Sequence, residues 1–243
     1  MNPFHRTQKI MSRVLVLAAV VCVVAALSGC PTQAPAPCQL QPQGNGAYTV
    51  RLTNAGAATA ACPAVFGDQW FMDDFPDHIA MRSVAVALPA LPDGGTDLNS
   101  PTWGKGSYSS KDPDTNDYCI VTSIQKPFFG PVGSTYDVKN LTFLSSALYI
   151  GTEWKADITY TPAGGTPCAY TGQAINPTTK CATNADCDPL SQPTNSGINY
   201  LYDQGCHLDT WATDLTKLSD GGASGLGICF FNKEFPSLGG FTK

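Results

Sequence analysis

EWKADITYT, residues 153–161, is the stretch that decides the fold class of this chain. Every second residue in it is apolar or aromatic: Trp154, Ala156, Ile158 and Tyr160. The residues between them are polar, and this period of two is typical of a half-buried β-strand, because successive side chains of a strand point to opposite faces of its sheet. The stretch therefore predicts a strand with one face in a hydrophobic core.

The same alternation recurs on both sides of this stretch, in residues 47–56, 82–88, 118–124 and 136–144. Pro, Gly and Asp cluster at 92–95, 131–133 and 162–165, which indicates turns. The one candidate for a short helix is 207–218, where Leu208, Trp211, Leu215 and Leu218 have roughly helical spacing. Several short strands without intervening helices predict a mainly β fold, either an antiparallel sandwich or a barrel-like domain.

The N-terminus has the layout of a secretory signal peptide. Residues 1–13 carry three basic and no acidic residues, and residues 14–29 are apolar or small throughout. A membrane-spanning helix needs about 20 apolar residues, and this run of 16 is followed by a Pro-rich polar segment. We therefore expect residues 1–29 to be removed rather than to remain as a span.

Leu27-Ser28-Gly29-Cys30, at the end of the apolar run, resembles the lipobox of bacterial lipoproteins. The resemblance implies cleavage before Cys30 and attachment of diacylglycerol to its thiol. One acyl chain holds a protein only marginally, at about 10⁴ M⁻¹, whereas two or three chains anchor it stably. Pro31 stands where the family's inner-membrane retention signal has Asp, so the resemblance implies an outer-membrane location. Both the periplasmic and the outer face of that membrane are compatible with the motif. In the alternative interpretation the protein is secreted and Cys30 forms a disulfide.

Composition narrows the class of partner. Removal of residues 1–29 takes three of the 14 basic residues and none of the 19 acidic ones, which leaves 214 residues with a net charge of −8. The sequence has no basic run that would follow a phosphate backbone, so we expect no nucleic-acid partner.

Pro-rich residues 30–46 are interpreted as a flexible tether, followed by a β domain over 47–178 and a cysteine-rich, loop-rich segment over 179–243.

Cysteine count predicts a disulfide framework. Without Cys22 in the signal stretch and Cys30, eight cysteines remain: Cys38, Cys62, Cys119, Cys168, Cys181, Cys187, Cys206 and Cys229. An even number in an exported chain favours four bridges, for which the sequence alone leaves 105 connectivities. A zinc site is the less favoured interpretation, because the chain has no C-x-x-C pair.

The last four cysteines belong to a distinct stretch. CATNADC (181–187) and the later GLGIC (225–229) resemble short cysteine-rich pieces of extracellular proteins and of cysteine-containing bacterial surface lipoproteins. We therefore hypothesise that the four C-terminal cysteines pair among themselves, and that the other four staple the strand-rich part.

The strongest polar cluster is GDQWFMDDFPDHIAMR (67–82), which brings Asp68, Asp73, Asp74, Asp77 and His78 within eleven residues. Crowded carboxylates bind hard cations and raise one another's pKa, so a metal or acid–base site is one interpretation. A solvated acidic loop, pinned to the core by its aromatic residues, is the favoured one. In a third, the aromatic and acidic side chains together form a sugar-binding surface.

Two stretches imitate the start of a calcium-binding loop, with oxygen-bearing side chains at alternate positions: Asp112, Asp114 and Asn116, and Asn184, Asp186 and Asp188. The EF-hand loop requires Gly at its sixth position, where this chain has Asp117 and Pro189. Neither is an EF-hand, and ordinary Asx turns are the alternative to a weak calcium site.

Catalytic motifs are scarce. After residue 29 the chain has only two histidines, His78 and His207, and it contains no nucleophile elbow, zinc-protease motif, P-loop or dinucleotide fingerprint. We expect no enzymatic activity and no cofactor apart from the lipid on Cys30. The sequence favours a lipid-anchored structural, adhesive or ligand-binding module with an unidentified protein or polysaccharide partner. The alternative is a lipid-anchored hydrolase, which would need a cleft holding His78 beside one of the nearby aspartates.

Overall fold

The computed structural model describes residues 37–40, 47–87, 100, 102–125, 127–145, 150–190, 198, 203–207 and 227–232. The signal stretch, Cys30 and the helix candidate from residue 208 onward lie outside these residues. The chain divides into two units, Met1–Pro35 and Ala36–Lys243, and the description below concerns the second. Among the described residues, no helix is long and apolar enough to cross a membrane.

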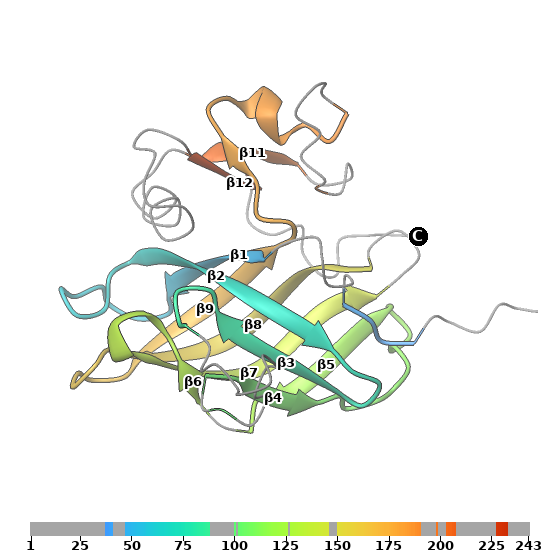
Figure 1. Ribbon diagram of the computed structural model, residues 1–243, viewed down its shortest axis with the longest axis horizontal. Coiled ribbons are helices and arrows are strands. Elements are labelled where there is room, and N and C mark those ends of the chain that lie inside the picture. The colour runs from blue at the N-terminus through green and yellow to red at the C-terminus, as the bar shows by residue number, and fades with distance from the viewer. Residues whose placement is uncertain are drawn as a thin grey trace, which may run out of the picture. The chain divides into compact units, whose positions relative to one another are not determined.

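Nine strands form the main sheet, and every pairing in it is antiparallel. They are β1 (Tyr48–Asn54), β2 (Val65–Asp74), β3 (His78–Ser83), β4 (Gly104–Ser107), β5 (Tyr118–Ser123), β6 (Phe128–Phe129), β7 (Thr135–Ser145), β8 (Ile150–Thr161) and β9 (Cys168–Ile175). Their order is β4-β3-β2-β1-β9-β8-β7-β5, with β6 paired to β7. Apart from β6, each strand therefore lies beside its neighbours in sequence (Figure 1).

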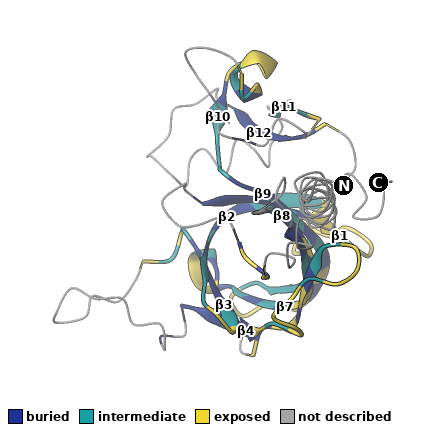
Figure 2. Cartoon of the chain, turned by 90° about the vertical axis from the view of Figure 1, so that its right-hand side faces the viewer, coloured by how far each residue is buried: buried dark blue, intermediate teal, exposed yellow. Residues whose placement is uncertain are grey.

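The two edge strands of this sheet, β4 and β5, come together and nearly close it into an eight-stranded barrel. Figure 2 shows the ring of strands end-on. The amide of Ser109 donates to the carbonyl of Ile120 at 2.8 Å, and the amide of Gln125 donates to the carbonyl of Lys105 at 2.7 Å. Of the two architectures left open by the sequence, the chain adopts the barrel. A closed sheet leaves few unpaired backbone groups at its edges.

Two glycines of β4 permit this close approach. A Cβ atom on Gly106 would lie 2.6 Å from Cγ1 of Val121 and 2.9 Å from the backbone oxygen of Ser123. A Cβ atom on Gly104 would lie 2.6 Å from the ring of Phe128. A larger residue at Gly106 would push β4 away from β5, and one at Gly104 would push it away from Phe128 and Ile124, because real Cβ atoms do not approach other heavy atoms so closely.

Alternation along each strand fills the interior. Trp154, Ala156 and Ile158 of β8 are buried, as period two predicts, and the exposed residues lie mostly in loops (Figure 2). The predicted strands at 47–56, 118–124, 136–144 and 153–161 are confirmed as β1, β5, β7 and β8. Strands β2, β4 and β9 were missed, because acidic residues and glycines interrupt their apolar alternation.

The strand predicted at 82–88 is wrong in its position. Strand β3 ends at Ser83, and residues 84–86 form a turn in which the amide of Val86 donates to the carbonyl of Ser83 at 3.3 Å. The hydroxyl of Ser83 also accepts a bond from the amide of Ala85 at 3.2 Å. These local bonds end the ladder although Val84 and Val86 continue the apolar alternation.

All eight cysteines of the framework are bridged, which indicates an extracytoplasmic location. The bridges are Cys38–Cys119, Cys62–Cys168, Cys181–Cys206 and Cys187–Cys229. Each joins two members of the same predicted set, so the hypothesis of separate N-terminal and C-terminal pairings agrees with the structure. At about 2–4 kcal/mol each, four bridges would rival the whole stability of an ordinary domain.

One end of the barrel, called here the Cys38 end, is covered by the first described segment. Cys38 is bonded to Cys119 of β5, and the amide of Leu40 donates to Oδ2 of Asp74 at 3.1 Å. Leu40 is buried in the same cluster as the interior side chains. Residues 37–40 fall within the stretch 30–46 interpreted as a tether, and they lie against the barrel rather than free of it.

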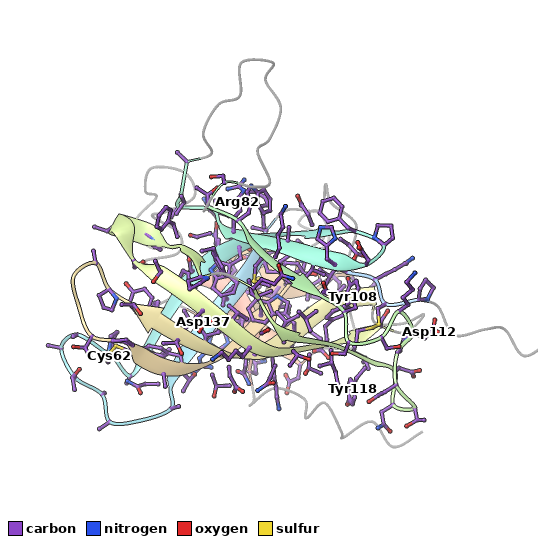
Figure 3. All side chains as sticks on the ribbon, turned by 90° about the horizontal axis from the view of Figure 1, so that it is seen from below. Cys62, Arg82, Tyr108, Asp112, Tyr118 and Asp137 are labelled. Carbon is purple, nitrogen blue, oxygen red and sulfur yellow. A yellow bond between two sulfur atoms is a disulfide. The ribbon has the colours of Figure 1, made fainter. Side chains whose placement is uncertain are left out.

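The opposite end, called here the Cys62 end, carries the loops 54–64, 129–134 and 161–167. Figure 3 shows Cys62 far from Tyr108, Asp112 and Tyr118, which lie toward the Cys38 end. The Cys62–Cys168 bridge joins the first loop to the start of β9. Phe66, Tyr160 and Tyr170 pack together beneath these loops, with ring centroids 4.9–6.4 Å apart.

The C-terminal segment forms a small sheet of its own, ordered β10 (Lys180–Cys181), β12 (Gly227–Phe231) and β11 (Gln204–His207). Its buried residues, which include Cys187 and Phe230, form a second hydrophobic cluster with Leu144 and Ile175 of the barrel strands. A single turn of 3-10 helix, η2 (Asn184–Cys187), packs on the sheet. The expected loop-rich cysteine segment therefore has a core stapled by two disulfides.

The close approach of β4 to β5 predicts that Gly106→Ala lowers the free energy of unfolding by about 1–3 kcal/mol, because the added methyl overpacks the junction. Urea denaturation followed by tryptophan fluorescence measures the effect. Gly56→Ala is the matched control, since its Cβ would meet only Oδ1 of Asn54, at 3.6 Å. Equal stability of the two variants would contradict the role given to Gly106.

Candidate functional site

The acidic stretch 67–82 is not a loop but the β2–β3 hairpin, and strand alternation separates its carboxylates. Asp68 points into the barrel, where it is fully buried. Asp74 lies on the same side of β2 at the Cys38 end, Asp73 is on the outer face, and Asp77 is in the turn. The residues expected to form a single polar cluster therefore lie in several separate environments.

Asp68 is the most unusual group in the interior, because it accepts four hydrogen bonds there. The amide of Gln69 and the hydroxyl of Ser83 donate to Oδ1, at 2.7 and 3.2 Å. The indole N–H of Trp70 and the hydroxyl of Tyr136 donate to Oδ2, at 2.9 and 3.0 Å. All four donors are neutral, so the carboxylate is solvated by hydrogen bonds rather than by a basic partner.

Burial dominates the electrostatics of this carboxyl group. Loss of water raises the pKa of Asp68 to about 6, because the charged form is disfavoured in the interior, while the four hydrogen bonds act in the opposite direction. Burial and the nearby Asp68 charge raise the pKa of Tyr136 well above its ordinary value. Near neutral pH, Asp68 is therefore ionised and Tyr136 keeps its proton.

Aromatic rings surround Asp68 and exclude water from it. Trp70 stacks on Trp154 with ring centroids 5.3 Å apart, and it meets Phe128 and Tyr136 edge-on at 5.1 and 5.0 Å. All four rings are fully buried. In this arrangement Asp68 cannot reach a substrate in solution, so it does not form an open acid–base site.

The sequence contains a signal for this position that was not used. In FGDQWFM, Phe66, Trp70 and Met72 occupy alternate positions, and Asp68 falls on the same face. Period two therefore places a carboxylate among inward-facing apolar side chains. The pattern does not predict which groups donate hydrogen bonds to Asp68, because Ser83 and Tyr136 belong to other strands, β3 and β7.

Asp74 and Asp73 have separate partners. At the Cys38 end, Asp74 accepts bonds from the Tyr108 hydroxyl and the Leu40 amide, and burial raises its pKa. On the outer face, burial raises the pKa of Asp73, and the charge of Arg82 opposes the shift. The Arg82 guanidinium lies 4.4 Å from the centre of the Phe71 ring, a cation–π geometry. These contacts are structural ones within the barrel wall.

His78 lies at the exposed hairpin turn. Its Nδ1 is 2.7 Å from Oδ1 of Asp77, whose side chain is 75% exposed. The bond to His78 lowers the pKa of Asp77. Phe75 stacks on the imidazole with centroids 4.5 Å apart. Of the five polar residues in the predicted cluster, only Asp77 and His78 are in direct contact, and they do not share a site with Asp68.

The calcium-like stretches are occupied by local hydrogen bonds. Oδ1 of Asp114 accepts the amides of Asn116 and Tyr118 at 2.8 and 3.0 Å, which is an Asx turn. Oδ2 of Asp186 accepts the amides of Ala182 and Thr183, both at 2.8 Å, and caps η2. Asp112, Asp114 and Asn116 are all exposed.

Within the described part of the chain, one group of metal-ligand residues converges: Cys181, Cys187 and Cys229, with Sγ atoms within 4.8 Å of one another. All three are in disulfides, so none offers a thiolate to an ion. His207 follows Cys206 on β11, and its ring lies edge-on to Phe230 at 6.3 Å. This region is therefore a disulfide core.

The raised pKa of Asp68 predicts a pH-dependent stability. Its pKa is 3.8 when unfolded and about 6 when folded, so the native state binds the extra proton. Wild-type stability should fall by about 3 kcal/mol as pH rises from about 4 to 7, relative to Asp68→Asn, which has no carboxyl group to ionise. Urea denaturation across this range measures the difference.

Asp112→Asn is the control for this experiment, since Asp112 is exposed. Its stability should follow that of the wild type at every pH. A constant stability difference between wild type and Asp68→Asn from pH 4 to 7 would show that Asp68 does not titrate as its burial requires. Absolute destabilisation of Asp68→Asn does not affect this result, because only the pH slope is compared.

Comparison of the chain with protein-family models, with curated proteins and with solved structures finds no match. The resemblance to bacterial lipoproteins thus depends on the motif that ends at Cys30 and on the cysteine-rich stretches 181–187 and 225–229.

Proposed function

We propose that this protein is a lipid-anchored binding module of the outer membrane, held by Cys30 and presenting the Cys62 end of its barrel to an uncharged partner. The lipobox-like residues 27–30 support the anchor, and the four disulfides support an extracytoplasmic site of action. We expect the partner to bind the outer surface of the barrel. Aromatic rings fill the interior and leave Asp68 without access to solvent.

The distribution of charge between the two ends is the observation that carries the proposal. The Cys38 end bears Asp74, Asp77, Lys111, Asp112, Asp114 and Asp117. At the Cys62 end, the loops 54–64, 129–134 and 161–167 contain no charged residue. Because the chain after residue 29 carries a net charge of −8, these three uncharged loops are a part of its described surface well suited to an uncharged partner.

The three loops of the Cys62 end form one connected surface. The Cys62–Cys168 bridge and the bond from the Tyr170 hydroxyl to the Pro63 carbonyl, at 3.0 Å, hold loop 54–64 beside β9. A Cβ atom on Gly133 would lie 3.7 Å from that of Ala163, so loops 129–134 and 161–167 are in contact. A surface fixed in this way loses little conformational freedom on binding.

Exposed apolar side chains lie at the tip of this surface. Phe129 is 40% exposed and Val132 is 95% exposed. Val132 has a φ of 56°, which is unfavourable for a β-branched residue, and backbone strain of this kind concentrates at functional sites. We take this tip as the contact for the partner.

The anchor limits how far the barrel can lie from the membrane in this proposal. Cys38 follows Cys30 by eight residues, which span at most about 28 Å when extended. Cys38 can therefore lie no farther than about 28 Å from the lipid-bearing residue. Exposure of Asp77 beside His78 favours this binding role over the hydrolase, which requires an imidazole and a buried carboxylate in one cleft.

The anchor has its own test. Cys30→Ser should leave the membrane fraction and should no longer incorporate labelled fatty acid, because the acylated thiol is lost. Cys22→Ser is the control and should keep both properties, since Cys22 lies inside the segment that is removed. Continued lipid labelling of Cys30→Ser would refute the anchor.

The binding surface is tested by placing a charge at its tip. Val132→Asp should reduce co-purification of partners cross-linked in the intact envelope about tenfold or more, since a carboxylate must be desolvated at an apolar contact. Leu190→Asp is the control, because Leu190 is 79% exposed but lies in the C-terminal segment. Equal recovery of partners with both variants would exclude the Cys62 end as the binding surface.

A further inference from the structure

A line of readily oxidised rings runs through the barrel from its centre toward the Cys62 end. The ring centroids of Trp154 and Trp70 are 5.3 Å apart, those of Trp70 and Tyr136 are 5.0 Å apart, and those of Tyr136 and Tyr160 are 5.3 Å apart. The first three rings are fully buried, and Tyr160 is partly exposed. Each gap is short enough for an electron to move from ring to ring.

Two of these rings share one proton acceptor. The indole N–H of Trp70 and the hydroxyl of Tyr136 both donate to Oδ2 of Asp68, at 2.9 and 3.0 Å. These distances are within the range for direct proton transfer. A phenol that loses an electron becomes strongly acidic, so its oxidation is much easier when a base already accepts its hydrogen bond. Asp68 is such a base near neutral pH, where its carboxyl group is ionised.

We propose that Trp154, Trp70, Tyr136 and Tyr160 form a proton-coupled path that carries an oxidising equivalent from the buried indoles to the surface phenol, with Asp68 as the internal proton acceptor. This activity is independent of the proposed anchor and binding function. It draws on the same extracytoplasmic setting that the disulfides indicate, in which oxygen-centred radicals are the class of oxidant that would start it. Because the framework cysteines are bridged, their thiols do not compete for the radical.

The steps balance in electrons and protons. Trp154 and Trp70 are buried, so an oxygen-centred radical at the outer face of the barrel takes one electron from one of them by tunnelling through the barrel wall, and the resulting radical cation resides on Trp70. Tyr136 returns an electron to Trp70 and passes its phenolic proton to Oδ2 of Asp68, which leaves a neutral tyrosyl radical. Tyr160 then reduces Tyr136, which recovers its proton from Asp68. Tyr160 releases its own proton to water, so the net change is one electron to the oxidant and one proton to solvent.

The end of the path suits disposal of the radical. Tyr160 is the one member with access to solvent, where a small reductant can restore it or a second copy can couple to it as dityrosine. Its ring also contacts Phe66, which is not readily oxidised, and Tyr170, which is buried and whose ring centroid lies farther away, at 6.4 Å, so Tyr160 is the member from which the radical meets solvent. The buried indoles are thereby returned to their reduced state before oxygen adds to them irreversibly.

Flash photolysis tests the proposal on the folded full-length protein, with a ruthenium tris-bipyridyl photosensitiser and persulfate as the source of oxidant. In the wild type, the tryptophanyl absorption should decay as the tyrosyl absorption rises. Tyr136→Phe should slow this conversion about tenfold or more, because the middle carrier is lost. The rise should also slow in deuterium oxide, since a proton moves with the electron. Unchanged kinetics in Tyr136→Phe would overturn the path.

Product analysis gives a second readout that does not depend on Tyr136. After limited oxidation, peptide mass spectrometry should find modification mainly at Tyr160, and Tyr160→Phe should shift it to Trp70, Trp154 and Tyr136. Tyr118→Phe is the matched control, because Tyr118 is also partly exposed but lies toward the Cys38 end (Figure 3). An identical distribution of modified indoles in Tyr160→Phe and Tyr118→Phe would overturn the assignment of Tyr160 as the end point.

Discussion

Closure of the sheet between β4 and β5 is the constraint on which the rest of this structure depends. An open sheet of these strands would expose its inward-facing apolar side chains and the backbone groups of two edges. Gly104 and Gly106 remove the side chains that would hold the edges apart, and backbone bonds at Ser109 and Gln125 join them. The interior then becomes a dry, closed space that side chains fill.

The polar group inside that space is tolerable because its hydrogen bonds are complete. A buried carboxylate without donors would cost several kcal/mol, whereas Asp68 has four donors from β2, β3 and β7. The same hydrogen bonds connect β2, β3 and β7 through the Asp68 carboxylate, and they hold Trp70 and Tyr136 in a fixed position relative to each other. The hydrogen bonds to Asp68 thus both stabilise its buried charge and fix the positions of Trp70 and Tyr136.

The two barrel ends differ in a way that follows from their connections. Segment 37–40 and the acidic loops meet at one end, where Cys38 is fixed to Cys119. At the other end, the described loops 54–64, 129–134 and 161–167 carry no charge, and the Cys62–Cys168 disulfide fixes the first of them to the start of β9. The barrel keeps these ends apart, so the proposed attachment and the proposed binding surface lie at different ends of one small domain.

The sequence by itself determined the class of fold, four of the barrel strands and the division of the disulfides into two sets. Alternation in stretches such as EWKADITYT and the count of cysteines are local properties, so they could be read directly. Only the tertiary structure decided between a sandwich and a barrel, and it alone placed Asp68 beside Ser83 and Tyr136. Closure and burial depend on contacts between residues far apart in the chain, such as Gly106 with Val121, which no local pattern records.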